Sequence, residues 1–201
     1  MPYLSFSQRM GIKPIEVPIQ TDCLNEDTRM DIWNSFYQWF SSYVVSDSDL
    51  IDYINGSERE LCIRVWSRYL RRDLSHLSYG QNLTGEVKRL ILSSTTAWYD
   101  ILDFCEQIIN DPYAQVKYFS KMLNDVFEKD NVGYRIIGKQ ISPITNETEI
   151  QSIESALALG RPFSGARIHI QTALEKYSDK TDPDYRNCVK ESISAVESMC
   201  Q

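Results

Sequence analysis

The sequence contains little histidine and no glycine-rich phosphate loop, and both shortages restrict the chemistry open to it. Only His76 and His169 occur among the 201 residues. Neither lies in a spacing that indicates a Ser-His-Asp or Cys-His site. The chain also lacks a Walker A loop, a dinucleotide-binding glycine pattern and a zinc-ligand cluster. We therefore predict that it uses no cofactor and no metal ion.

Cysteine is scarce as well, and its spacing excludes two structural roles. The cysteines are odd in number, lie far apart and contain no C-x-x-C pair, so they indicate neither a zinc site nor a disulfide framework. The N-terminus lacks an apolar signal core, and no apolar run reaches about 18 residues. These absences predict a cytoplasmic protein with no membrane partner. The cysteines are Cys23, Cys62, Cys105, Cys188 and Cys200.

Positive charge is in the minority, which argues against broad binding of nucleic acid. The net charge is −7, from 28 acidic and 21 basic residues, so RNA binding is not indicated over the whole surface. Basic residues nevertheless gather on one side of an expected helix over residues 58–72. This basic face is either solvated or binds a phosphate backbone or an acidic partner. Its members are Arg59, Arg64, Arg68, Arg71 and Arg72.

Apolar residues recur with helical spacing along most of the chain and predict a mainly α, multi-helix bundle. One region differs, because YRIIGKQISPIT carries two β-type runs around Gly138-Lys139 and predicts one small β-hairpin near residues 134–144. Thr145 or Asn146 caps the next helix, and Asn146 has Glu149 at capping-box spacing. A loop is expected over SYGQNLTG. The expected helices are residues 26–45, 47–54, 58–72, 86–110, 112–129, 146–160, 164–177 and a last one from 182.

The last stretch begins like a helix that needs a partner. Asp182 is a suitable N-cap, and Pro183 suits the first helical position. Apolar residues then recur with helical spacing, and an apolar stripe of this kind must be covered by another surface. We expect either that this sequence is the front part of something larger or that it forms a homodimer through the C-terminal helix. The stripe consists of Val189, Ile193, Val196 and Cys200.

Arg71 and His76, with four residues between them, are a candidate ribonuclease pair. In such a pair the arginine neutralises the scissile phosphate, and the histidine moves the proton of the 2′-hydroxyl. Leu74 and Ser75 indicate a helix end at this point, in which case the two residues are neighbours by coincidence. His169 is interpreted as a surface residue of a helix or a satisfied interior one.

Three blocks of sequence, taken in order, carry a resemblance to a known family. They are FSQRMGIKPIEVPIQTDCLNEDTRMDIWN (residues 6–34), GYRIIGKQISPITNETEIQSIESAL (residues 133–157) and DPDYRNCVKESISAVESMC (residues 182–200). The chain resembles bacterial AbiJ-like abortive-infection proteins, in which an AbiJ N-terminal domain precedes a HEPN domain. Between the first two blocks, the match is carried by WYDILDFCEQII.

The resemblance implies a phage-defence role and two domains. Residues 1–160 would be the AbiJ N-terminal domain, and residues 161–201 the start of a helical HEPN domain that is incomplete here. HEPN domains are often associated with RNA cleavage by an arginine followed, four to six residues on, by a histidine late in the domain. That motif is missing after residue 161. The acidic residue that an early HEPN helix often supplies would be Glu191 or Glu197.

Three functional hypotheses follow. The first is a non-catalytic sensor or regulatory module that binds a phage or host trigger and restrains a HEPN-type ribonuclease. The second is a homodimeric, metal-independent ribonuclease with a composite site. The third is an antitoxin-like or scaffold protein. For the first, the expected binding residues either contact the ligand or are structural, with Trp33 packed and Arg29 and Arg135 paired to carboxylates. They are Gln20, Arg29, Trp33, Tyr134, Arg135, Arg64, Arg68 and Arg71.

Overall fold

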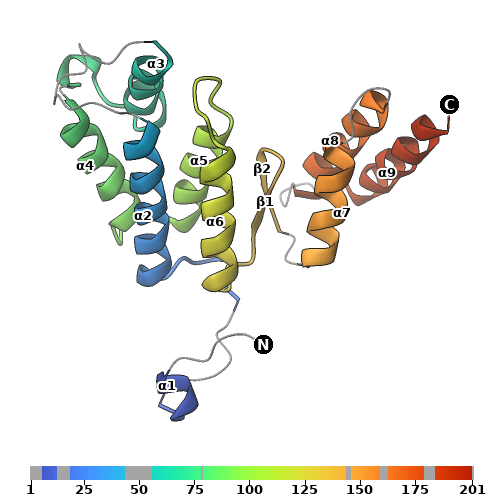
Figure 1. Ribbon diagram of the computed structural model, residues 1–201, viewed down its shortest axis with the longest axis horizontal. Coiled ribbons are helices and arrows are strands. Elements are labelled where there is room, and N and C mark those ends of the chain that lie inside the picture. Colours follow the sequence, from blue (N-terminus) through green and yellow to red (C-terminus); the bar gives the residue numbers. More distant parts are fainter. Residues whose placement is uncertain are drawn as a thin grey trace.

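The structure is a computed structural model that describes residues 6–12, 19–43, 56–77, 79–143, 146–158, 163–178 and 184–200. The expected short helix over 47–54 lies outside these residues. The mainly α class with one small hairpin is confirmed (Figure 1). The elements are α1 (Phe6–Arg9), α2 (Glu26–Tyr43), α3 (Ser57–Arg64), α4 (Tyr79–Leu92), α5 (Trp98–Ile109), α6 (Lys117–Lys129), β1 (Arg135–Ile137), β2 (Gln140–Ser142), α7 (Glu147–Leu157), α8 (Ser164–Ser178) and α9 (Tyr185–Met199).

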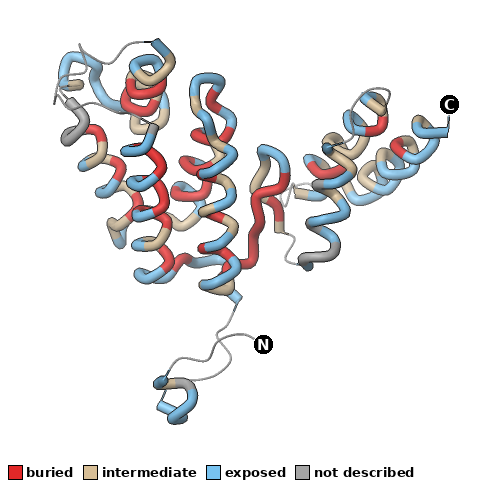
Figure 2. The backbone as a smooth tube through the Cα atoms, viewed as in Figure 1, coloured by how far each residue is buried: buried red, intermediate tan, exposed pale blue. Residues whose placement is uncertain are grey.

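The larger core is built around the aromatic side chains of α2, which packs against α4 and α6. Phe36 lies against Phe104 of α5 and Phe119 of α6, with ring centroids 5.7 Å and 6.3 Å apart. Trp39 stacks on Phe119 at 4.8 Å, and its indole N–H donates to the carbonyl of Gln115 at 3.0 Å. Trp39 is therefore buried without leaving its indole N–H unpaired. Figure 2 shows the buried stripe that runs along α2.

The expected long helix over residues 86–110 is two helices, because the chain turns between α4 and α5. At the turn the hydroxyl of Ser93 lies 2.7 Å from that of Thr95 and accepts the backbone N–H of Thr95 at 3.2 Å. Hydroxyl side chains that bond locally in this way compete with the helical ladder. α4 also begins at Tyr79, inside the stretch predicted to be a loop.

The expected helix over residues 58–72 ends early and changes its type. α3 passes into a π-helix over Val65–Tyr69, and the N–H of Leu70 reaches the carbonyl of Val65 at 2.9 Å. Arg71 then has a φ of 52°, a left-handed conformation that stops a helix. A π-turn inserts one extra residue and rotates the side chains that follow it. The regular basic face expected from helical spacing is therefore interrupted.

α6 begins five residues later than the expected start at Pro112, since the structure has its first residue at Lys117. The chain first makes a turn in which the carboxylate of Asp111 accepts the backbone N–H of Tyr113 at 2.9 Å. The carbonyl of Asp111 also accepts the N–H of Ala114, at 3.2 Å. An aspartate that bonds the backbone two residues ahead favours a turn over a helix.

The hairpin is anchored to α5 and α6 by side chains that bond its backbone. Asn124 of α6 accepts the N–H of Ile136 at 2.7 Å and donates to the carbonyl of the same residue at 2.9 Å. Glu106 of α5 accepts the N–H of Ile141 at 2.8 Å. β1 and β2 are antiparallel, with Ile136 facing Ile141, and Gly138 turns the chain with a φ of 64°.

The other side of the hairpin contributes to a smaller core shared with α7 and α8. Ile137 is completely buried there with Leu174, and the side chains of Ile153 and Leu157 pack against them. At the end of β2, the hydroxyl of Ser142 lies 3.0 Å from that of Ser178 on α8. The hairpin thus contributes residues to both the larger and the smaller core, and Figure 1 shows it between α6 and α7.

The C-terminal helices α8 and α9 pack against each other as a pair. The expected cap of α7 is confirmed, since Asn146 accepts the N–H of Glu149 at 3.2 Å. α9 begins later than expected, because its N-cap is Asp184, which accepts the N–H of Asn187 at 3.1 Å. Residues 182–183 lie outside the described part of the chain. None of the described helices combines the length and hydropathy needed to cross a membrane.

Candidate functional site

Gln20, an expected binding residue, is buried and ties the N-terminal segment to the end of α6. Its side-chain amide donates to the hydroxyl of Thr28 at 2.9 Å and to the carbonyl of Asp130 at 2.8 Å, and its oxygen accepts the N–H of Asn25 at 2.7 Å. Its backbone forms a parallel bridge with Val132. All these bonds are internal, so the polar atoms of this side chain hold the fold together.

Arg29 and Trp33 of α2 also face other elements of the chain. The guanidinium of Arg29 donates to the carbonyls of Ser93 at 2.7 Å and Thr96 at 2.9 Å. It thereby satisfies carbonyls that the end of α4 leaves open, whereas the structural alternative had expected a carboxylate partner. Trp33 is buried, and the ammonium of Lys88 lies 5.8 Å from the centre of its ring.

Tyr134 and Arg135, at the start of the hairpin, lie at the same contact between the N-terminal segment and the chain that follows α6. The ring of Tyr134 stacks on Trp98 at 5.7 Å, and its hydroxyl donates to the carbonyl of Thr21 at 2.7 Å. Arg135 is buried and donates to the carbonyls of Val132 at 2.9 Å and Tyr134 at 2.7 Å. The structure therefore brings Gln20, Tyr134 and Arg135 together at one end of the larger core, with their polar groups bonded inside the chain.

The expected basic face divides into an internal and an external part. Arg64 turns inward, and its Nε donates to the carboxylate of Asp111 at 2.6 Å. Tyr69 donates its hydroxyl to the same carboxylate. Arg72 pairs with Glu86 at 2.9 Å. Arg59, Arg68 and Arg71 remain exposed at the surface, and none of them forms an ion pair with another described residue.

Asp111 is the most deeply buried carboxylate of this cluster, with 2% of its surface exposed. Burial alone would raise the pKa of Asp111, but hydrogen bonds from Arg64, Tyr69 and the N–H of Tyr113 outweigh burial and lower it. Burial, followed by the bond to Asp111, raises the pKa of Tyr69. The cluster is therefore a closed network in which the aspartate stays ionised.

The candidate ribonuclease pair does not share a helix. Arg71 lies in the left-handed turn after the π-helix, and His76 ends a 3₁₀ turn over Leu74–His76 that Asp73 caps. Both side chains are exposed. Helical proximity, on which the pairing depended, is therefore absent at these positions.

A different histidine meets a carboxylate, across α8 and α9. Nδ1 of His169 lies 2.7 Å from Oε2 of Glu191, one of the two acidic residues that the HEPN resemblance singled out. Both side chains are partly exposed. A carboxylate bonded to one imidazole nitrogen fixes the tautomer and leaves the other nitrogen to accept a proton. The second candidate, Glu197, is exposed further along α9.

Sequence reasoning about His169 missed its contact with Glu191. The two residues lie 22 positions apart on different helices, and the contact depends on how α8 packs against α9. Spacing along either helix alone carries no signal for it.

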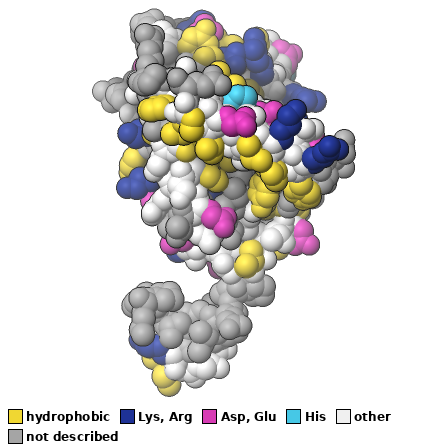
Figure 3. Space-filling model, turned by 90° about the vertical axis from the view of Figure 1, so that its right-hand side faces the viewer, with side chains coloured by type: hydrophobic (Ala, Val, Ile, Leu, Met, Phe, Trp, Pro, Cys, Tyr) yellow, Lys and Arg dark blue, Asp and Glu magenta, His cyan; other side chains and the backbone are white. Residues whose placement is uncertain are grey.

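Figure 3 looks onto the end of the molecule formed by the C-terminal helices, where hydrophobic side chains gather among charged ones. Several apolar residues of α9 are exposed here, while Ala195 on its other side is buried against α8. The expectation that the apolar stripe of this helix is uncovered within its own chain holds for the described residues. The exposed apolar residues of α9 include Val189, Ile193 and Val196 of the stripe, and also Tyr185 and Met199.

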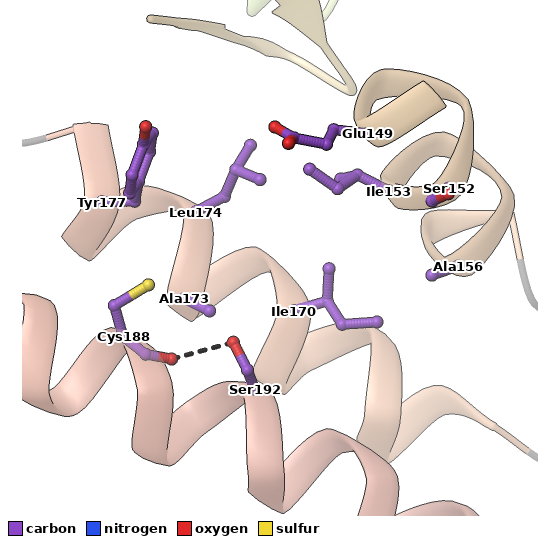
Figure 4. A pocket seen from close by; sticks show the side chains of 10 residues that line it. All are labelled: Glu149, Ser152, Ile153, Ala156, Ile170, Ala173, Leu174, Tyr177, Cys188 and Ser192. Atoms are coloured by element: carbon purple, nitrogen blue, oxygen red, sulfur yellow. Dashed lines mark hydrogen bonds between the residues drawn. The ribbon is translucent and has the colours of Figure 1, made fainter. Parts of the chain in front are cut away.

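An apolar pocket of about 380 Å³ opens between α7, α8 and α9 (Figure 4). Ile153, Ile170 and Leu174 form most of its wall, and Glu149 and Cys188 supply polar atoms. Burial, and then the charge of Asp184, raises the pKa of the Cys188 thiol. A protonated thiol is a poor nucleophile, so the pocket is suited to hold an apolar group and not to covalent chemistry.

The cysteines are all free thiols in the structure. Burial raises the pKa of both Cys62 and Cys105 to about 12, and these two residues belong to the larger core. Within the described ranges, no group of three or more His, Cys, Asp or Glu side chains is placed to hold a metal ion.

Residues 4–159 match the family model described as AbiJ N-terminal domain 4, so the chain belongs to that family. This membership associates the protein with abortive infection. α8 and α9 lie beyond the matched residues. No curated protein and no solved structure matches the chain.

Proposed function

We propose that this protein is a non-catalytic sensor and regulatory module that binds a phage or host trigger in the cytoplasm and controls a HEPN-type ribonuclease effector. The observation that carries the proposal is the exposed apolar face of α9, in which Val189, Ile193 and Val196 are 58%, 54% and 62% exposed. A helical face of this kind stabilises a protein only when a partner covers it. The AbiJ domain supplies the defence context.

A continuous set of contacts supports communication between the AbiJ domain and this face. Asn124 and Glu106 hold one side of the hairpin, and Ile137 packs into the smaller core on the other. That core includes Leu174 of α8, and α8 packs along α9. A ligand that moved the hairpin would therefore also shift α8 and α9, because closely packed side chains transmit a displacement from one element to the next.

A second candidate function is a homodimeric ribonuclease with a composite site, and the contact between His169 and Glu191 favours it. The imidazole is bonded to a carboxylate through one nitrogen, as in sites where a histidine acts as a general base, and it lies on the helix pair that carries the exposed apolar stripe. Two copies joined through α9 would bring two such pairs near one seam. An arginine to neutralise the phosphate would have to come from Arg167 or Arg186.

One experiment separates the two functions. Purified protein is incubated with total RNA and with a labelled single-stranded RNA in the presence of EDTA, and fragment length is followed. We expect the RNA to stay intact, and cells that express the chain alone to grow at the rate of cells with an empty vector. Cleavage that persists in EDTA and disappears in His169→Ala and Glu191→Gln, with His76→Ala as the matched control, would replace the regulatory proposal with the ribonuclease.

A further inference from the structure

Two cavities flank the tip of the hairpin. The first, of about 740 Å³, lies between the start of α6, β1 and the end of α7. The second, of about 530 Å³, lies between the hairpin and α8. Gly138, Lys139 and Leu157 line both of them. The cavities therefore form one groove that passes over the hairpin tip, where the AbiJ domain meets α8.

The groove is basic although the protein as a whole is acidic. Lys117, Lys121 and Lys139 line the first cavity, and Arg167 joins Lys139 in the second. None of these four cations forms an ion pair with a carboxylate of the described chain. Among the described residues that line either cavity, the one carboxylate is that of Glu175, in the second. Because the net charge is −7, four unneutralised cations on one groove are a local reversal of charge that attracts an anion.

The remaining lining indicates the size and type of this anion. Val116, Ile136 and Leu157 give the first cavity an aliphatic wall, and Ser120 adds a hydroxyl. The volumes fall within the range of small-molecule sites, roughly 300–1,000 Å³. No aromatic ring is among the described residues that line either cavity, whereas proteins that hold single-stranded nucleic acid stack its bases on such rings. The lining therefore favours a small, multiply charged ligand over RNA.

We propose that this groove binds a nucleotide that carries two or more phosphate groups. The phosphates lie on the lysines of the first cavity and against Lys139 at the hairpin tip, and the apolar part of the ligand rests on the aliphatic wall. Arg167 reaches the same ligand from α8. Binding depends only on the charges and shape of the groove. The further statement that this nucleotide is the trigger of the regulatory module rests on the proposed function.

The test is calorimetric titration of the whole chain at low salt with ATP, GTP and inorganic pyrophosphate, with AMP as the weakly charged comparison. We expect ATP or GTP to bind, AMP to bind at least about tenfold more weakly, and affinity to fall as salt is raised. The double variant Lys117→Gln, Lys121→Gln and the single variant Lys139→Gln should each weaken binding about tenfold or more. Lys190→Gln, an equal change of charge on the exposed side of α9, should leave it unchanged.

Three outcomes overturn the proposal. They are no heat of binding with any of the three probes, equal weakening by Lys190→Gln, and tighter binding of a twelve-nucleotide single-stranded RNA than of ATP. Circular dichroism of each variant verifies that a loss of binding is not a loss of fold. Failure here leaves the regulatory role open, since that role is decided by the RNA-cleavage experiment. Cleavage of RNA by the chain, in turn, leaves nucleotide binding to be decided by the titration.

Discussion

At the level of single residues, Asp111 is a buried carboxylate that is bonded on several sides. Its carboxylate accepts hydrogen bonds from Arg64 and Tyr69, which come from α3 and the π-helix. The network therefore joins the π-helix to the turn before α6. A π-turn places side chains where a regular helix would not, and here it presents Tyr69 to the same carboxylate that Arg64 already holds. We infer that Asp111 stabilises the contact between these elements of the larger core.

Asp111→Asn should destabilise the protein by about 3 kcal/mol at neutral pH, because it leaves the inward-facing Arg64 without its charged partner. The folded pKa of Asp111 is lowered, so its ionised form contributes stability above the unfolded pKa of about 3.9. That contribution disappears as the pH falls through the folded pKa. The difference in unfolding free energy between wild type and variant, measured by urea denaturation from pH 7 to pH 3, should therefore shrink towards acid.

Asp125→Asn, an exposed change of the same chemistry on α6, is the control and should alter stability by less than about 0.5 kcal/mol at every pH. A difference for Asp111→Asn that stays constant with pH would mean that the charge of this carboxylate contributes nothing to stability.

At the level of elements, the hairpin is the part whose short strands need outside support. β1 and β2 have three residues each, and an isolated two-stranded hairpin is marginally stable in water. Asn124 supplies both a donor and an acceptor to the backbone of Ile136, as a third strand would. The Asn124 side chain therefore supplies the two hydrogen bonds that a neighbouring strand would give to Ile136.

Asn124→Ala should cost about 2–3 kcal/mol of unfolding free energy, because it leaves the buried N–H and C=O of Ile136 without partners. Urea denaturation followed by circular dichroism measures the change. Asp125→Ala, next to it on the exposed side of α6, is the matched control with an expected effect within about 0.5 kcal/mol. Equal midpoints for Asn124→Ala and wild type would contradict the anchoring role.

Elements defined by local signals could be predicted from the sequence. Gly138-Lys139 between two β-type runs predicted the hairpin, and the spacing of Val189, Ile193 and Val196 predicted the exposed stripe of α9. The break between α4 and α5 could not be predicted from apolar spacing, because it depends on local hydroxyl bonds and on carbonyls that Arg29 binds from 64 residues away.

The candidate site was predictable to a lesser extent for the same reason. Arg64 reads as part of a basic surface in sequence, and its inward turn requires Asp111, which lies 47 residues further on. The cations of the groove are also dispersed, since Lys117, Lys139 and Arg167 belong to three different elements. No spacing rule connects residues that only the packing of α6, the hairpin and α8 brings together.

At the level of the whole molecule, the exposed face of α9 is the surface through which we expect copies of the chain to associate. We predict that the protein forms a homodimer through this helix, measured as solution mass by light scattering. Ile193→Glu should yield a monomer, because it places a charge in the middle of the apolar face. Tyr118→Glu introduces the same charge at an exposed position of α6, a helix that Figure 1 shows apart from α9, and should leave the dimer intact.

A wild-type chain that is monomeric at all concentrations would contradict the dimer and leave α9 as the surface for a different partner, such as an effector helix. A dimer that survives Ile193→Glu would contradict the α9 contact, place the contact between copies elsewhere and likewise leave α9 as the surface for a different partner.

The bond between Gln20 and the segment after α6 has a consequence for the order in which the molecule can be made. Gln20 donates to Asp130, 110 positions later in the chain, and the helices of the larger core lie between them in sequence. During synthesis the N-terminal residues leave the ribosome first. Gln20 can then bond to Asn25 and Thr28, which are close to it in sequence, but its bond to Asp130 cannot form until the end of α6 has emerged. The contact between Gln20 and Asp130 therefore closes a long loop of the chain and forms late during synthesis.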